Sequence, residues 1–210
     1  MKPTNPRIPA SERRSQILAV ASALFARQGF HGTTTRQIAE QVGVKEIILF
    51  RLFPTKQDLY WAVIEAKCQA KPGRQALQDA LAGAADEQAA FTEIALGLLE
   101  RNTHDTTLMR LLLFSALEAH ELSERFFQTY TAQFFEVLAT YIRRRTRAGA
   151  FRTVDPILAA RGFLGMVFQY VLAQQLFGGA RHHPFDHREV AETFARIWLD
   201  GIRNPKRKRS

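Results

Sequence analysis

The chain has 210 residues, 46% hydrophobic and 23% charged, a composition that excludes wholesale disorder and is typical of a globular protein with a sizeable core. The formal net charge is +9, and the basic excess lies at the two ends. Residues 1–60 hold nine Lys or Arg against four Asp or Glu, and residues 203–210 hold five bases and no acid. Because residues 61–202 are nearly neutral, only part of the molecule is expected to meet a polyanion, either nucleic acid or an anionic membrane face.

The single cysteine and the polar N-terminal residues indicate a cytoplasmic protein. Cys68 is the single cysteine of the chain, which excludes an internal disulfide. The polar residues 1–14 lack the apolar stretch of a signal peptide. Residues 162–180 carry no charge, yet they include three glutamines and four glycines and are marginal for a membrane span. We therefore expect a helix buried in protein there, and no contact with a membrane.

The spacing of apolar residues predicts helices along almost the whole chain and no strands, so the fold class is all-α. The first helix is expected to begin with Ser11 as its N-cap and to end at Gly29. Two short helices follow within residues 34–53, and a fourth begins at a Thr55–Asp58 capping box. Later helices are expected near residues 75–82, 86–102, 106–120, 123–148, 155–177 and 186–202.

Residues 34–53, TTRQIAEQVGVKEIILFRLF, have the pattern of two short helices that cross at a tight turn. Thr34 and Gln37 can form a capping box, and Gly43 lies at the turn, where a positive φ costs glycine little. The positions that must face inward are apolar or small: Ile38, Ala39, Val42, Val44, Leu49 and Leu52. The start of the second helix is then exposed, and an exposed helix fits the major groove of DNA. The side chains placed to meet base edges are Lys45, Glu46, Ile47 and Ile48.

Residues 11–65 resemble the DNA-binding domain of the TetR family of regulators, above all in GFHGTTTRQIAEQVGVKEIILFRLFPTKQDLYWAVIEA. The resemblance implies a one-component repressor that binds a palindromic operator as a homodimer and senses a small molecule. Half-sites of such operators lie about 34–36 Å apart.

The resemblance also assigns roles to single residues. Thr34 and Thr35 are expected to donate to phosphate from a helix N-terminus, and Arg36 to reach a base or a nearby phosphate. Lys45 and Arg51 suit phosphate contact, and Lys56 suits the family's contact to the DNA backbone from the start of the fourth helix.

Five positions depart from the family pattern. Phe50 stands where a tyrosine usually contacts phosphate through its hydroxyl, so only apolar contact remains. Lys45 stands where a serine usually caps the recognition helix, and it cannot accept an amide hydrogen bond. Ile47 and Ile48 replace small residues and can touch thymine methyl groups. Leu52 replaces a polar or aromatic residue and is expected in the core.

The domain organisation follows from these assignments. Residues 1–55 are expected to form the helix-turn-helix domain with a flexible N-terminal arm, residues 56–203 a helical effector-binding and dimerisation domain, and residues 204–210 a disordered basic tail. The homodimer is expected to form through the last two helices, whose apolar character suits a four-helix interface.

Twelve of the 16 phenylalanines lie at or after Phe91, so a cavity in this region would suit a small, mostly apolar or aromatic effector. Effector binding is expected to shift the fourth helix, change the spacing of the two recognition helices and release DNA. The candidate lining residues are Trp61, Phe91, Phe114, Tyr130, Phe134 and Tyr170.

An alternative interpretation stays open: a helical dimeric adaptor that binds a partner protein or an anionic membrane surface through its basic ends. Enzymatic activity is not expected, because the chain has no nucleophile elbow, phosphate-binding glycine loop or HExxH motif. No cofactor is expected.

Two clusters of polar residues resemble ligand sites. A metal is not expected either, because the sequence His182-His183-Pro184 with His187 gives poor ligand geometry. The arginine-rich end of the helix near residues 143–147 can be an anion site, but a solvated helix end is the favoured interpretation, since bases suit a helix C-terminus.

Overall fold

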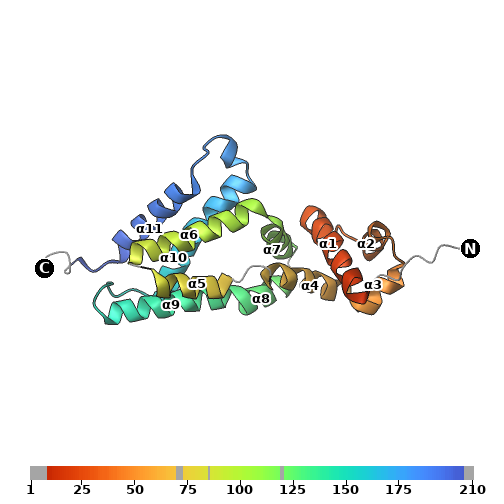
Figure 1. Cartoon of the computed structure of the whole chain (residues 1–210), viewed down its shortest axis with the longest axis horizontal. Coiled ribbons are helices and arrows are strands. Elements are labelled where there is room, and N and C mark those ends of the chain that lie inside the picture. The colour runs from red at the N-terminus through yellow and green to blue at the C-terminus, as the bar shows by residue number, and fades with distance from the viewer. Residues whose placement is uncertain (1–8, 70–72, 85, 119–120, 206–210) are drawn as a thin grey trace, which may run out of the picture. The chain divides into compact units, whose positions relative to one another are not determined.

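The structure is a computed structural model that describes residues 9–69, 73–84, 86–118 and 121–205. These residues are helical almost throughout and contain no β-strand, only an isolated bridge between Phe151 and Arg203, which confirms the all-α class (Figure 1). The α-helices are α1 (Ala10–Gln28), α2 (Thr35–Val42), α3 (Glu46–Leu52), α4 (Lys56–Gln69), α5 (Gly73–Gly83), α6 (Glu87–His104), α7 (Thr107–Leu117), α8 (Glu121–Phe126), α9 (Ala132–Arg147), α10 (Pro156–Gln175) and α11 (His187–Ile202).

The chain divides into two compact units, which we describe separately. Unit 1 consists of residues 1–71 and 107–125, and unit 2 of residues 72–106 and 126–210. The N-terminal helices α1–α4 therefore share a unit with α7 and α8, which come from the middle of the chain. The predicted functional boundary at residue 55 falls inside unit 1, since α4 packs against α1.

The core of unit 1 is built around the rings of Phe25, Phe30 and Tyr60. The Tyr60 ring lies edge-on to both phenylalanines, with centroids 4.7 Å and 5.4 Å away. Its hydroxyl donates to the carbonyl oxygen of Leu111 at 2.6 Å, which joins α4 to α7 inside the core. Burial raises the pKa of the Tyr60 hydroxyl, and the carboxylate of Glu118 raises it further, so this donor stays protonated.

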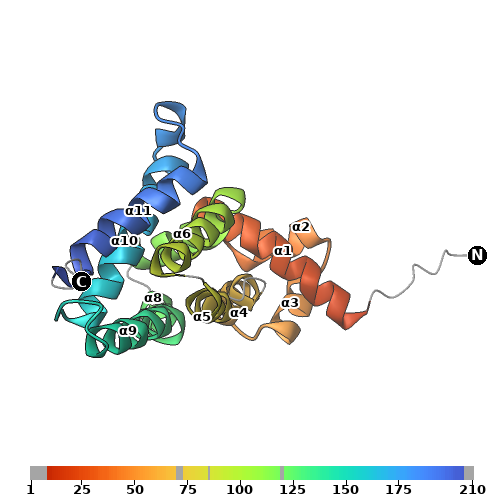
Figure 2. The same cartoon turned by 60° about the vertical axis from the view of Figure 1, so that its left-hand side comes forward.

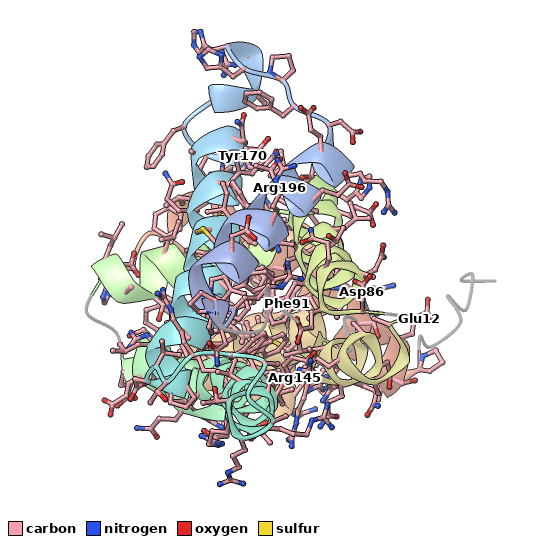
Figure 3. The ribbon with its side chains drawn as sticks, turned by 90° about the vertical axis from the view of Figure 1, so that its left-hand side faces the viewer. Glu12, Asp86, Phe91, Arg145, Tyr170 and Arg196 are labelled. Atoms are coloured by element: carbon pink, nitrogen blue, oxygen red, sulfur yellow. The ribbon has the colours of Figure 1, made fainter. Side chains whose placement is uncertain are left out.

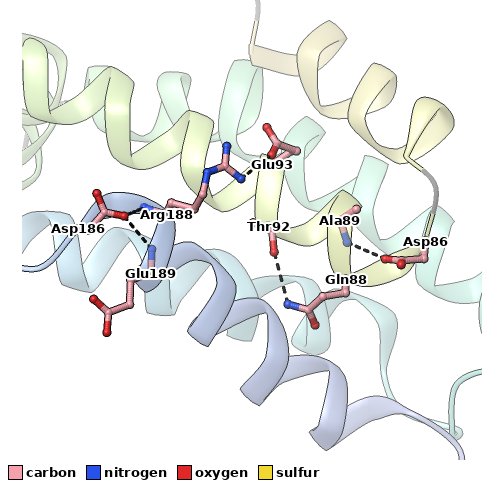
Figure 4. Close-up of polar contacts among 8 residues, drawn as sticks. All are labelled: Asp86, Gln88, Ala89, Thr92, Glu93, Asp186, Arg188 and Glu189. Carbon is pink, nitrogen blue, oxygen red and sulfur yellow. Dashed lines mark hydrogen bonds and ion pairs between the residues drawn. The ribbon is translucent and has the colours of Figure 1, made fainter.

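The predicted helix starts are confirmed at the capping boxes and wrong at α1. Thr55 and Asp58 exchange side-chain-to-amide hydrogen bonds, and Asp155 caps α10 ahead of its first-turn proline. Asp186 caps α11 by accepting from the amides of residues 188 and 189 (Figure 4). By contrast, α1 begins at Ala10 rather than after Ser11, because the Pro9 carbonyl already accepts from the Arg13 amide at 2.9 Å.

The helix predicted over residues 123–148 is interrupted. A π-helical turn, Phe127–Thr131, separates α8 from α9. The wider turn places Phe126 against Tyr130 and Phe127 against Phe135, with centroids 5.3 Å and 6.3 Å apart. Apolar spacing cannot reveal such a turn, because one extra residue leaves the surrounding pattern helical.

Helices α6, α10 and α11 pack together in unit 2 (Figure 2) and contribute an aromatic core that includes Phe91 (Figure 3). The ring of Phe91 is fully buried and lies 4.9 Å from Phe163 and 4.4 Å from Trp198. Phe151 packs edge-on to Trp198 at 6.1 Å, which closes the cluster. Because these rings pack against one another, this part of unit 2 is a packed core.

Helix α10 is long and apolar enough to cross a membrane by length and composition alone. We expected it to be buried in protein, but only 22% of its most apolar 18-residue window is buried within the single chain. Leu158 is 67% exposed, and a Cβ atom at Gly162 or Gly165 would meet nothing within 4 Å. The expectation is wrong for one chain, because α6, α9 and α11, which pack against α10, leave part of its surface uncovered.

Candidate nucleic-acid interface

The turn between α2 and α3 has the geometry that the sequence predicts. The Thr34 side chain accepts from the Gln37 amide at 3.1 Å and the Gln37 side chain accepts from the Thr34 amide at 3.0 Å, which completes the capping box of α2. Gly43 adopts the left-handed conformation with φ of 74°. A residue with a side chain would be strained there, so this glycine permits the sharp bend between the two helices.

Helix α3 turns one face inward and the other to the surface. Leu49 is fully buried, whereas Ile47 is 60% exposed and Phe50 41% exposed. Lys45 and Arg51 are exposed as well, while the predicted inward residues Val42, Val44 and Leu52 are half-buried. The Lys45 side chain makes no cap hydrogen bond, as the sequence predicts. The surface formed by residues 45, 47, 50 and 51 is therefore available to a partner, with Glu46 and Ile48 half-buried at its edge.

Two of the expected DNA contacts have carboxylate partners inside unit 1. The Thr35 hydroxyl donates to Glu46, so a phosphate contact by Thr35 uses its backbone amide or requires this bond to break. The Arg36 guanidinium donates to Glu40 at 2.9 Å, and this hydrogen bond, with the charge of the same carboxylate, raises the pKa of Arg36. Because the Arg36–Glu40 pair is largely exposed, exchanging Glu40 for a phosphate costs little.

Lys56 is held against the core at the start of α4. Its ammonium lies 4.3 Å from the centre of the Phe30 ring, a cation–π contact. Burial lowers the pKa of the Lys56 ammonium, and the Glu118 carboxylate opposes that shift. The lysine expected to contact the DNA backbone is thus positioned by the fold and is not a freely moving surface charge.

Sequence reasoning missed Glu118, the residue that holds the turn between α1 and α2. Its carboxylate accepts from the amide of Phe30 at 3.0 Å and from that of His31 at 3.4 Å, across 88 and 87 positions of sequence. Gly29 allows this approach, since a Cβ atom there would collide with the Glu118 carboxylate and the Phe114 ring. A local pattern cannot reveal a partner so distant in the chain.

The two expected effector residues of unit 1 have structural contacts. Trp61 is buried, and its indole N–H donates to Glu65. The guanidinium of Arg125 lies 3.9 Å from the centre of the Trp61 ring. Phe114 is half-buried in α7.

The four expected effector residues of unit 2 lie in different surroundings. Phe91 belongs to the aromatic core, while Tyr130 and Tyr170 each contact one phenylalanine ring, at 5.3 Å and 5.7 Å. Phe134 borders a cavity of about 30 Å³. The other residues around this cavity are Gly73, Ala76, Leu77 and Ala80 of α5 and Glu93, Ile94, Leu98 and Arg101 of α6.

A capped helix, a glycine turn and a second helix with an exposed outer face define a helix-turn-helix DNA-binding protein. Two family descriptions match the chain: "Bacterial regulatory proteins, tetR family" over residues 17–63, and "AefR-like transcriptional repressor, C-terminal domain" over residues 89–200. The protein belongs to the TetR family of DNA-binding transcriptional regulators.

The chain is similar to individual proteins over different lengths. The nucleoid occlusion factor SlmA of Vibrio vulnificus is 30% identical over 162 residues, which are 75% of this chain and 81% of SlmA. The transcriptional activator FasR of Mycolicibacterium smegmatis is 39% identical, but over 59 residues only, 28% of this chain and 27% of FasR. The crystal structure of AibR, solved with isovaleryl coenzyme A and operator DNA, superimposes with a TM-score of 0.68 at 17% identity, covering 88% of this chain and 97% of AibR.

Replacing Glu118 tests whether this carboxylate holds the turn before α2. Glu118→Ala leaves the amides of Phe30 and His31 without their acceptor, so the free energy of unfolding is expected to fall by about 1–3 kcal/mol. Glu118→Gln keeps one acceptor oxygen, so its free energy of unfolding should fall by less. Urea unfolding measures both, with Glu121→Ala, an exposed acid of α8, as the control. Equal midpoints for Glu118→Ala and Glu121→Ala would contradict the assignment.

Proposed function

We propose that the protein is a ligand-responsive repressor that acts in the cytoplasm, binds a palindromic operator as a homodimer and is released by a small, mostly apolar or aromatic effector. The observation that carries the proposal is the exposed outer face of α3, presented by a capped and glycine-bent helix pair in a TetR-family chain. The match of residues 89–200 to a repressor C-terminal domain supports repression over activation.

The proposed operator contacts fall into two kinds. Thr34, Thr35, Lys45, Arg51 and Lys56 contact phosphates, which positions the protein without reading sequence. The contacts to base edges come from Arg36, Glu46, Ile47 and Ile48, with Phe50 in apolar contact with a sugar or base. Ile47 is the most exposed apolar side chain of α3 and suits a thymine methyl group.

Substitutions in α3 test this division. Lys45→Gln or Arg51→Gln should weaken binding to all duplexes and lower the slope of log K against log salt by about 1 each. Ile47→Ala should instead change the preference among operator sequences. The measurement is a gel shift with the DNA upstream of the protein's own gene. Arg27→Gln, which removes an exposed base from the end of α1, is the matched control.

Two results would count against these contacts. If Arg27→Gln and Lys45→Gln lost equal DNA affinity, binding would depend only on the net charge of the protein. No preference for upstream DNA over a scrambled duplex would favour the adaptor alternative.

The proposed dimer forms through α10 and α11. Leu158, Gly162, Gly165 and Phe168 recur on one face of α10, and this face is exposed in the single chain. Ile197 adds a 56% exposed apolar side chain on α11, which contacts α10. A second copy of the same face would cover this apolar surface, and the two glycines would let the helices approach closely.

Gly165→Glu tests the dimer without disturbing the protomer. The new side chain enters open space in one chain but places a charge in the proposed interface, so the variant should sediment as a folded monomer. Leu117→Glu, at an 83% exposed leucine of α7, should remain dimeric in the same sedimentation experiment. A dimeric Gly165→Glu variant would exclude this interface.

The cavity beside Phe134 is the proposed starting point of the effector site. At about 30 Å³ it holds no organic ligand, so binding must widen it. Helix α5 is the wall that can move most cheaply, because Leu77 is its one buried residue in the described chain. The lining is apolar apart from Glu93 and Arg101, which suits an apolar body with an anionic group. The complex of AibR with an acyl coenzyme A supports an acyl compound as one such effector.

The proposed signal passes along the chain from α5 to α4. Helix α5 begins at Gly73 in unit 2, and α4 ends at Gln69 in unit 1. Displacement of α5 by a ligand therefore pulls on the helix that carries Lys56 and Tyr60. This is the shift of the fourth helix that would separate the recognition helices, provided that the ligand binds the shifted state more tightly.

A pair of alanines on α5 tests the effector site. Ala80 lines the cavity and Ala82 is exposed, so Ala80→Trp should fill the site while Ala82→Trp leaves it open. Isovaleryl coenzyme A and isovalerate are the probes, and their effect on operator affinity is the readout. We expect at least one probe to weaken operator binding by the wild type and by Ala82→Trp, but not by Ala80→Trp. Equal responses of the two variants would exclude this cavity.

A further inference from the structure

An open hollow of about 460 Å³ lies in unit 2 where the start of α6 meets the ends of α9 and α11. Asp86 and Arg145, which border it, lie at the same end of the bundle in Figure 3. Its volume is within the range of small-molecule sites, roughly 300–1,000 Å³. The hollow shares no lining residue with the cavity beside Phe134. Its lining residues are Leu81, Ala84, Asp86, Glu87, Gln88, Ala90, Tyr141, Arg145 and Arg203.

Two guanidinium groups converge on one carboxylate in this hollow. The Nε atom of Arg145 donates to Oε1 of Glu87 at 2.7 Å, and Nε of Arg203 lies 3.6 Å from Oε2 of the same residue. Glu87 is the most enclosed of the three, with 15% of its side chain exposed, whereas about a third of each arginine side chain faces solvent. Glu87 thus holds both arginines in place while leaving part of each guanidinium accessible from the hollow.

Tyr141 supplies a further donor. Among the described residues, none accepts a hydrogen bond from its hydroxyl. Burial raises the pKa of this hydroxyl, and the nearby Glu87 carboxylate adds to the shift while Arg145 and Arg144 oppose it, so the group stays protonated at neutral pH. The ring, together with Leu81, Ala84 and Ala90, gives the hollow an apolar wall beside its charged one.

The charged groups that line the hollow are two acids and two bases. The acids that face it are Glu87 and Asp86, and one carboxylate oxygen of Asp86 already accepts from the Ala89 amide to cap α6 (Figure 4). Asp200 lies 3.9 Å from Arg203, and Glu136 pairs with Arg143 farther along α9. The two bases of the lining are Arg145 and Arg203, while Arg144, Arg147 and Arg152 are exposed bases that do not line the hollow.

We propose that this hollow binds a phosphorylated small organic molecule, with its phosphate between Arg145 and Arg203 and its organic part against the Tyr141 wall. A ligand must compete with Glu87, which is already in place. A ligand with a single carboxylate would replace the charge of Glu87 with an equal charge, so its binding would gain no electrostatic free energy. A phosphate monoester carries about −1.5 to −2 at neutral pH and three acceptor oxygens, so it gains in charge and in hydrogen bonds from both guanidiniums and Tyr141.

Binding of AMP and of adenosine by the full-length protein tests the proposal, because the two probes differ only in the phosphate. Isothermal titration calorimetry at low salt should detect AMP and not adenosine. Arg145→Gln and Arg203→Gln should each weaken AMP binding by about tenfold or more, and Tyr141→Phe by less. Glu87→Gln should tighten it, because the competing internal anion is removed. A purely structural ion cluster would predict no gain from that change.

Two matched controls separate this site from other basic surfaces. Arg147→Gln removes an exposed arginine of α9 that does not line the hollow, and Lys45→Gln removes a base from the proposed operator contacts. Both should bind AMP within about twofold of the wild type, since neither contributes a hydrogen bond there. Tyr141→Phe and Glu87→Gln keep the test decisive if either arginine variant fails to fold. The proposal is overturned if AMP and pyrophosphate fail to bind at millimolar concentration to the wild type and to Glu87→Gln, or if a control loses as much affinity as Arg145→Gln.

Discussion

The DNA-binding unit depends on polar contacts between its N-terminal helices and α7, a helix from the middle of the chain. The buried hydroxyl of Tyr60 donates to the Leu111 carbonyl, and the Glu118 carboxylate accepts from two amides of the turn between α1 and α2. Removal of one partner from either contact would leave a buried or half-buried polar group without a hydrogen bond. The loss of folding free energy would then exceed what the hydrogen bond itself contributes. The helix-turn-helix is therefore completed by a segment that the chain reaches only after building part of unit 2.

This insertion has a consequence for signalling in the proposed repressor. The backbone passes between the two units after α4, before α7 and after α8. A change in unit 2 that moves α5, α6 or the π-helical turn can therefore act on unit 1 through these covalent connections. The contacts of Tyr60 and Glu118 would pass such a change on inside unit 1, because Tyr60 joins α4 to Leu111 of α7 and Glu118 accepts from two amides of the turn before α2.

In both proposed anion sites, an internal carboxylate already pairs with the arginine side chains. Glu40 pairs with Arg36 on α2, and Glu87 pairs with Arg145 and Arg203 in unit 2. In each case the acid orients the guanidinium and limits its repulsion with other bases. A phosphate carries more charge and more acceptor oxygens than one carboxylate, so exchange favours the phosphate while a weaker anion leaves the internal pair intact.

Local sequence determined the helices, most of their caps and the bend at Gly43, because these depend on residues three or four positions apart. The apolar spacing within residues 34–53 likewise determined which side of α3 faces the core. The sequence did not predict the start of α1 or the π-helical turn. A neighbouring proline at the first and one extra residue in the second leave the apolar pattern almost unchanged. Tertiary structure alone decided that α7 belongs with α1 and α4, that Glu118 holds a turn 88 positions away, and that Arg145 and Arg203 meet at Glu87. The physical reason is that these contacts join segments whose separation in sequence carries no periodic signal and whose meeting is set by how whole helices pack.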